Sequence, residues 1–136
     1  MFVDTIFAVA TPPGRSAIAV VRISGSKAGL SPELFASNCP TAGQFCLARL
    51  RKGDQVIDEA IILFMAAPKS STGEDVCEIH CHGSIAIINK IAAILTQCGP
   101  ELNIRPAEEG EFTRQAFYNG KMDLIQVEGL SDLLRA

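Results

Sequence analysis

The sequence lacks the features that would place the protein in a membrane or in a secretion pathway. None of its apolar runs reaches the roughly 18–20 residues needed to span a bilayer, although 48% of its residues are hydrophobic. Residues 1–10 lack the basic front of a signal peptide and begin as a strand pattern instead. We therefore expect a cytoplasmic protein with no membrane association.

An excess of positive charge is also missing. Lys and Arg number 12 against 15 Asp and Glu, which gives a net charge of −3 and a pI of about 5.3. A domain that grips phosphate backbones by itself normally has a basic face and a high pI. Nucleic-acid binding by this chain alone is therefore disfavoured.

Signatures of several catalytic and metal-binding classes are absent as well. The chain has no Gly-x-x-x-x-Gly-Lys-[Ser/Thr] phosphate loop, no Gly-x-Gly-x-x-Gly and no Gly-x-Ser-x-Gly elbow. Its two histidines share one predicted strand, and its five cysteines form no disulfide framework, which indicates reduced thiols. We expect no catalytic residue, no metal site and no GTP hydrolysis by this chain.

What the sequence does contain is a mixture of strand and helix patterns. At 136 residues it fits one domain, or one domain with a short extension. Strands are predicted at residues 5–10, 17–24, 45–52, 55–66 and 75–82, with residues 102–105 as a further short candidate and a hairpin turn at Gly53-Asp54. Helices are predicted over 26–38, with an interruption near Ser31-Pro32, and over 85–98 and 111–120. The mixture of a hairpin with helices predicts an α+β fold with a mixed sheet of about five strands and roughly three helices.

Signals at the helix ends support these boundaries. Ser84 is the predicted N-cap of helix 85–98, and Gly99-Pro100 its stop. Gly120 closes the next helix, and Asp123 with Gln126 forms a capping-box-like start for another. That last helix has a start signal and no stop signal. We therefore expect the chain to be the front part of a longer protein.

Arg22 is the first candidate functional residue. In strand 17–24 either face looks buried, so the Arg22 side chain projects beside apolar neighbours. A buried guanidinium requires an anionic partner. That partner is either an internal carboxylate, which makes a structural salt bridge, or an anionic ligand or partner chain.

The strand at residues 75–82 has a second unusual face. Alternation puts Glu78, His80 and His82 on one face and Cys77, Ile79 and Cys81 on the other. The polar face meets solvent in one interpretation, and a ligand or another chain in the other. Zinc is disfavoured because the thiols and imidazoles point to opposite faces.

Lys121 is the third candidate. It follows Asn119-Gly120, in the break before the helix predicted from Asp123. A cation is unfavourable at a helix N-terminus, where the macrodipole prefers anions. Lys121 therefore either points to solvent or is retained for a ligand.

Several segments together resemble the amino-terminal region of the MnmE (TrmE) tRNA-modification GTPases, over essentially the whole chain. They stand in order and at matching spacing: residues 4–6 (DTI), 10–14 (ATPPG), 17–25 (AIAVVRISG), 72–76 (TGEDV), Glu78, 82–83 (HG), 110–113 (GEFT), 116–117 (AF) and 119–124 (NGKMDL). The resemblance implies a folate-binding domain similar in fold to the tetrahydrofolate-binding part of the glycine-cleavage T-protein. It also implies a homodimer with the folate site near the interface. Residues 1–120 then form the tetrahydrofolate-binding and dimerisation domain, and 121–136 the start of a truncated helical domain.

The resemblance also implies what the whole protein does. Members of this family work with an FAD-dependent partner of the MnmG (GidA) type and modify the wobble uridine of tRNA at C5. Tetrahydrofolate, as 5-formyl-tetrahydrofolate, supplies the one-carbon unit. GTP, Mg and K ions belong to a G domain that this chain lacks.

The family's folate contacts fall on Arg22, Glu78 and Lys121 of this sequence. An ionised carboxylate such as Glu78 can accept two adjacent N–H groups of a pterin, and the cations can pair with the glutamate tail. Two departures from the family pattern, Glu109 in place of Pro and Gln115 in place of Arg, make this neighbourhood less basic. The competing hypothesis is a purely structural dimerisation module whose charges pair internally.

Overall fold

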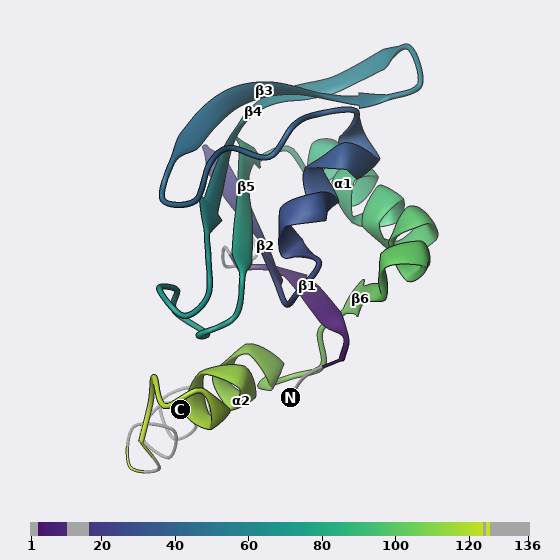
Figure 1. Ribbon diagram of the computed structural model, residues 1–136. Helices are drawn as coiled ribbons and strands as arrows, with labels where there is room; N and C mark the ends of the chain where they lie inside the picture. Colours follow the sequence, from purple (N-terminus) through teal and green to yellow (C-terminus); the bar gives the residue numbers. More distant parts are fainter. Residues whose placement is uncertain (1–2, 11–16, 124, 126–136) are drawn as a thin grey trace.

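The computed structural model describes residues 3–10, 17–123 and 125 (Figure 1). Within them, six strands form one sheet: β1 (Thr5–Val9), β2 (Ile18–Ser24), β3 (Phe45–Lys52), β4 (Gln55–Met65), β5 (Val76–His82) and β6 (Ile104–Pro106). The helical elements are the 3₁₀ helices η1 (Ala28–Phe35) and η2 (Gly99–Leu102) and the α-helices α1 (Ile85–Cys98) and α2 (Glu111–Tyr118). The predicted α+β class is confirmed, with six strands in place of about five.

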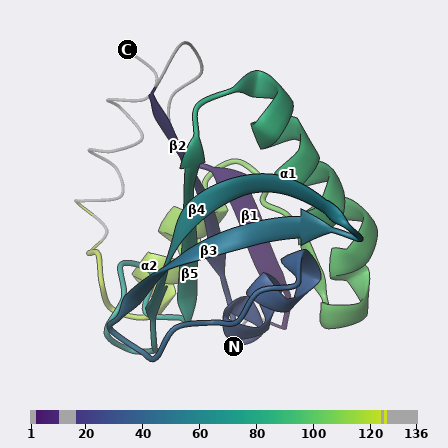
Figure 2. The ribbon, with the colours of Figure 1, turned by 90° about the horizontal axis from the view of Figure 1, so that it is seen from above.

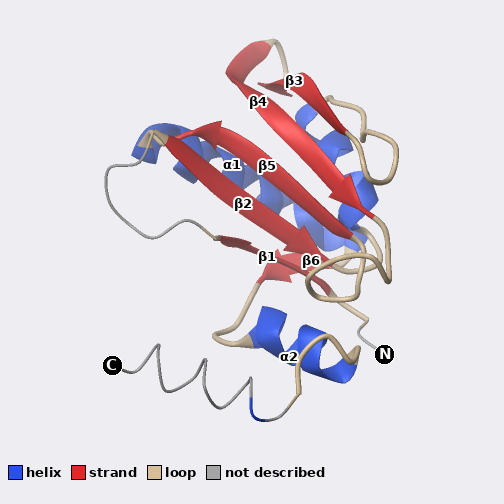
Figure 3. Cartoon of the chain, turned by 90° about the vertical axis from the view of Figure 1, so that its left-hand side faces the viewer, coloured by secondary structure: helices blue, strands red, loops and turns tan. Residues whose placement is uncertain are grey.

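The sheet is mixed, as predicted. Its strand order is β3-β4-β5-β2-β1-β6, and every neighbouring pair is antiparallel except β1 with β6, which are parallel. The β3–β4 hairpin forms one edge and turns at Gly53, whose φ of 59° is a conformation that glycine adopts readily. Figure 3 shows the strands side by side in this order, with one face toward the viewer.

Apolar residues on alternate positions build the core on one face of the sheet. Ala19, Val21 and Ile23 of β2 are buried, as are Cys77, Ile79 and Cys81 of β5. They pack against the buried side of α1 and against η1, which both lie on this side of the strands (Figure 2). The period-2 alternation that the sequence predicts for β5 is confirmed.

The segment 26–38 is not the interrupted α-helix that we predicted. It is one 3₁₀ helix, η1, with Pro32 inside it. Pro32 has no N–H to donate to the Ala28 carbonyl, and the Ser31 hydroxyl donates to that carbonyl instead (2.6 Å). A proline inside a helix removes a hydrogen bond of the α-helical ladder, which disfavours a continuous α-helix here.

The predicted bounds of α1, with Ser84 as N-cap and Gly99 after the last residue, are confirmed, but the geometry at both ends differs from the expected caps. Ser84 precedes the helix but its side chain makes no capping hydrogen bond. Gly99 is right-handed (φ −63°), and the chain continues into η2, where Asn103 takes the left-handed conformation. Gly99 is needed for close packing, because an added Cβ would lie 2.9 Å from the Ile104 carbonyl oxygen.

Two predicted features fall outside the described residues. One is the turn that the Pro-Pro-Gly run predicts at residues 11–14. The helix predicted from Asp123, with Gln126 in its capping pair, is the other, since Ile125 is the one described residue beyond Asp123.

Candidate functional site

The face of the sheet opposite α1 carries the polar residues that the sequence marks. Arg22 of β2 lies directly opposite Glu78 of β5, and Glu78 lies opposite Leu63 of β4. The expectation that both faces of β2 are buried is wrong, because Ile18 on this face is 56% exposed. None of the described helices covers this face of the sheet (Figure 3), and the Arg22 side chain is 32% exposed.

Glu78 is the centre of a charged cluster. Its Oε2 accepts hydrogen bonds from Nε of Arg22 (2.8 Å) and lies 2.8 Å from Nη2 of the same guanidinium. His80 Nε2 lies 3.0 Å from Oε1. Register places Arg22 and Glu78 side by side, and alternation places His80 two residues along on the same face.

The electrostatics of this cluster keep Glu78 ionised. Burial acts to raise the pKa of Glu78, but hydrogen bonds from His80 and Arg22 outweigh it, and the pKa lies below its ordinary value. An ionised carboxylate accepts hydrogen bonds and cannot donate them. The cluster therefore presents a partly open acceptor beside a guanidinium, on an exposed sheet face.

Lys121 lies just beyond the end of α2. Gly120 has a φ of 73°, its N–H donates to the Phe117 carbonyl (3.1 Å), and the Lys121 N–H donates to the Ala116 carbonyl (2.8 Å). This is a Schellman ending, so the predicted stop at Gly120 is confirmed. Lys121 is exposed, and it sits at the C-terminal side of α2, where the helix dipole favours a cation. The argument that its charge is misplaced concerned the next helix, predicted from Asp123, which lies outside the described residues.

Motif segments that are far apart in the sequence meet where β2 ends. The Ser24 hydroxyl donates to Gln115 Oε1 (2.6 Å) and lies 2.7 Å from the Thr72 hydroxyl. Asn119 Nδ2 donates to the Thr72 carbonyl (2.9 Å) and to Glu74 Oε2 (2.9 Å). The loop before β5, the end of β2 and helix α2 are thus joined through polar contacts.

Gln115 has a different place from the one that the sequence suggested. We expected its substitution for Arg to make a ligand-facing surface less basic, but Gln115 is 1% exposed and lies inside this polar network. No signal in the sequence showed that the residue is buried. Glu109, the other departure, is exposed in the turn before α2.

A second set of contacts fixes the start of α2, and sequence reasoning missed it. Arg105 of β6 binds Glu111 with two hydrogen bonds, Nη1 to Oε1 (2.6 Å) and Nη2 to Oε2 (2.7 Å). Its Nε donates to Asp4 Oδ2 (2.9 Å). We call Arg105, Glu111 and Asp4 the clamp. Hydrogen bonds from Arg105 hold the pKa of Glu111 below its ordinary value, although burial acts to raise it.

His82 lies apart from these groups at the other end of β5. Asp58 accepts hydrogen bonds from the His82 backbone N–H (2.8 Å) and lies 2.7 Å from its Nδ1. This contact ties β4 to β5. In the described part of the chain, no group of three or more His, Cys, Asp or Glu side chains is arranged to hold a metal ion. No helix among the described residues is long and apolar enough to cross a membrane.

Comparison with known proteins gives the family. A family model described as the GTP-binding protein TrmE N-terminus matches residues 5–121. The chain belongs to this family. The match covers all six strands and α2 and ends at Lys121.

The chain is also similar to part of several longer proteins. The chain is 47% identical to a tRNA modification GTPase MnmE from Paracoccus denitrificans over 133 residues, 98% of this chain and 31% of that protein. It is 47% identical to one from Beijerinckia indica, covering 98% of this chain and 29% of the relative. The protein of the same name from Rhodospirillum rubrum is 43% identical, covering 100% and 32%. The chain thus spans about a third of the length of these relatives.

Proposed function

We propose that residues 1–120 form the folate-binding and dimerisation domain of a tRNA-modification GTPase, with 5-formyl-tetrahydrofolate bound by Arg22, Glu78 and Lys121. The observation that carries this proposal is the pairing of Arg22 and Glu78 on the uncovered face of the sheet. The two residues come from strands far apart in the sequence and are the ones that the family resemblance marks.

The chemistry of the site suits a pterin with an acidic tail. Glu78, with its pKa held low, accepts adjacent N–H groups of the 2-amino-4-oxo edge. Arg22 and Lys121 supply positive charge for carboxylates of the glutamate tail. Because Arg22 and His80 already contact Glu78, the ligand shares or displaces these contacts when it binds.

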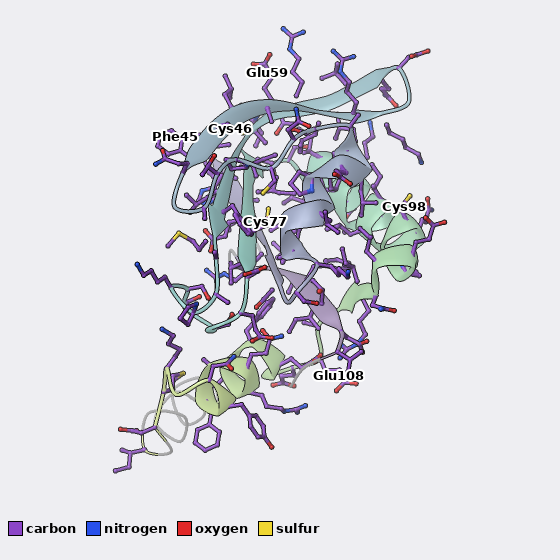
Figure 4. All side chains as sticks on the ribbon, viewed as in Figure 1. Phe45, Cys46, Glu59, Cys77, Cys98 and Glu108 are labelled. Carbon is purple, nitrogen blue, oxygen red and sulfur yellow. The ribbon has the colours of Figure 1, made fainter. Side chains whose placement is uncertain are left out.

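The same sheet face supports the proposed homodimer. Phe45 and Leu47 of β3 are 69% and 71% exposed, and Ile61, directly opposite Leu47, is also exposed. Figure 4 shows Phe45 pointing away from the sheet. Exposed apolar side chains grouped on one face are typical of an interface. The group ends beside His80, which lies opposite Ile61, so a second copy covering it would come close to the charged cluster.

The remaining roles belong to the longer protein. We propose that residues 121–136 begin its helical domain. An FAD-dependent MnmG-type partner and tRNA then act with the complete cytoplasmic protein in wobble-uridine modification. GTP, Mg and K ions bind its G domain. This chain alone is expected to hydrolyse no GTP, and a GTPase rate from the purified 136-residue chain would contradict that.

Calorimetry with 5-formyl-tetrahydrofolate tests the ligand role. Arg22→Ala and Glu78→Gln should each weaken binding about tenfold or more, the loss expected for one charge-assisted contact. The matched control is Glu59→Gln, because Glu59 also pairs with an arginine across neighbouring strands (3.1 Å to Arg49) but is exposed and points outward (Figure 4). Absence of binding to well-folded wild-type chain would remove the folate role.

Sedimentation tests the dimer. Leu47→Asp should turn the dimer into a monomer, because it places a charge in the apolar group of the interface. The control, Ile85→Asp, puts the same charge on an exposed residue at the start of α1 and should leave the dimer intact. A wild-type chain that is monomeric at high concentration would contradict the proposal.

The structural alternative rests on the internal pairing itself. Glu78 contacts both Arg22 and His80 within the chain. If they serve only as a scaffold, Arg22→Ala lowers the melting temperature while added folate changes neither protein. A ligand-dependent rise in the melting temperature of the wild type alone would favour the folate site.

A further inference from the structure

Helix α2 is attached to the rest of the domain mainly through polar groups. Its buried residues are Glu111, Gln115 and Ala116, and none of them belongs to the hydrophobic core cluster. Figures 1 and 3 show α2 beyond the end of the sheet, away from α1. The position of α2 therefore depends on specific hydrogen bonds more than on apolar packing.

The buried end of this attachment is an ordered chain of donors and acceptors. The Glu74 N–H donates to the Thr72 hydroxyl (3.2 Å), and the Ser24 hydroxyl donates to Gln115 Oε1 (2.6 Å). Because the Ser24 proton is used in the bond to Gln115, the Thr72 hydroxyl is the donor in its 2.7 Å hydrogen bond to the Ser24 hydroxyl. Gln115 Nε2 turns back to the Ser24 carbonyl (3.5 Å). Among the described residues, no buried side-chain nitrogen or oxygen lacks a hydrogen-bond partner, and a fully satisfied network of this kind is rigid.

This chain of contacts connects the two halves of the proposed site. At one end, Ser24 lies two residues from Arg22 on the same strand, β2. At the other end, the Asn119 N–H donates to the Gln115 carbonyl (3.0 Å), and the Lys121 N–H donates to the next carbonyl, that of Ala116 (2.8 Å). Gln115 thus links the strand that carries Arg22 to the helix end that carries Lys121.

We propose that Gln115 is a positioning residue: it holds α2 against Ser24 and so sets where Lys121 stands relative to Arg22. This inference rests on the proposed folate site and adds a residue that does not touch the ligand. Without the Gln115 contacts, α2 shifts or undocks, and a ligand that spans both halves loses the Lys121 contact. The pairing of Arg22 with Glu78 is left unchanged.

A double-mutant cycle tests the inference. Gln115→Met keeps the side-chain volume and removes both hydrogen bonds, and it should weaken 5-formyl-tetrahydrofolate binding about tenfold, as Lys121→Ala does. The double variant should bind no more weakly than Lys121→Ala, because the two changes remove the same contact. Gln97→Met, on the exposed side of α1, is the matched control and should bind like wild type.

Hydrogen exchange and a second variant test the role of Gln115 independently of the binding cycle. Hydrogen exchange without ligand should be faster at the amides of α2 in Gln115→Met and unchanged in α1. Ser24→Ala removes the same contact from the other side and should reproduce both effects, so it replaces Gln115→Met if that variant folds poorly. If the losses of folate affinity in Gln115→Met and Lys121→Ala add up in the double variant, the role of Gln115 is overturned and the proposed site is not. The same holds if Gln115→Met leaves both α2 exchange and folate binding unchanged. Absence of folate binding to wild type would instead remove the proposed site itself.

Discussion

Replacement of Arg105 by alanine should release helix α2 from the sheet. The guanidinium gives Glu111 two short hydrogen bonds (2.6 and 2.7 Å) and Asp4 one (2.9 Å). These bonds join β6, the start of α2 and the segment before β1. In Arg105→Ala, Glu111 keeps the hydrogen bond from the Glu108 backbone N–H (2.7 Å) and loses both bonds from the guanidinium.

The size of the effect follows from burial. The Glu111 side chain is 7% exposed, and removal of one partner from a buried ion pair costs about 3–5 kcal/mol. Arg105 is 40% exposed, so water screens part of the interaction, and we expect a loss of about 2–3 kcal/mol. Asp4 is 47% exposed, and Asp4→Asn should cost less than about 1 kcal/mol.

Hydrogen exchange and urea unfolding together measure this difference. Arg105→Ala should speed amide exchange throughout α2 and lower the free energy of unfolding, while Asp4→Asn should do little of either. The amides of α1 should become faster only through the change in global stability. Equal, small losses in the two variants, or unchanged exchange in α2, would refute the account of the clamp.

Three other predictions follow from single side chains. The pKa of Glu111 is lowered in the folded state, so the ionised Glu111 stabilises the fold above about pH 4.3, the ordinary glutamate value. This contribution is lost as pH falls through the folded pKa. Urea titrations at several pH values should therefore show a smaller loss of stability at acidic pH in Glu111→Gln than in the wild type. Gly73→Ala should cost about 2 kcal/mol or more in thermal melts, because Gly73 has a φ of 82° and an added Cβ would overlap Asn119 Cβ; a cost near zero would contradict that packing. Burial raises the pKa of Cys77 to about 12, so a disulfide reagent should modify exposed Cys98 in the native protein and Cys77 only on unfolding (Figure 4).

Local patterns in the sequence predicted most of the sheet and α1. Alternation in β2 and β5, and the turn at Gly53, are properties of a few neighbouring residues, and the structure agrees with them. The prediction was wrong for η1, which is a 3₁₀ helix with Pro32 inside it. At Gly99 the need for glycine comes from packing against Ile104, which the local sequence does not reveal.

For the candidate site, too, local patterns in the sequence predicted some features and missed others. Strand faces marked Arg22 and Glu78 separately, but their pairing depends on the register between β2 and β5, across 56 residues of chain. The attachment of α2 depends on partners still farther apart, 91 residues for Ser24 with Gln115 and 101 for Asp4 with Arg105. Such partners are fixed by tertiary structure, so neither burial of Gln115 nor the clamp could be predicted from spacing.

NMR titration of the labelled chain with 5-formyl-tetrahydrofolate tests the central claim most directly, because it locates the ligand. Amide shifts should change at Arg22, Glu78 and Lys121 and their neighbours, and the hairpin turn at Gly53, at the far edge of the sheet, should not respond. Saturable shifts confined to the uncovered face of β2 and β5 and to the end of α2 are the predicted result. No shifts at saturating ligand, or shifts elsewhere in the fold, would contradict the assignment of this face as the folate site.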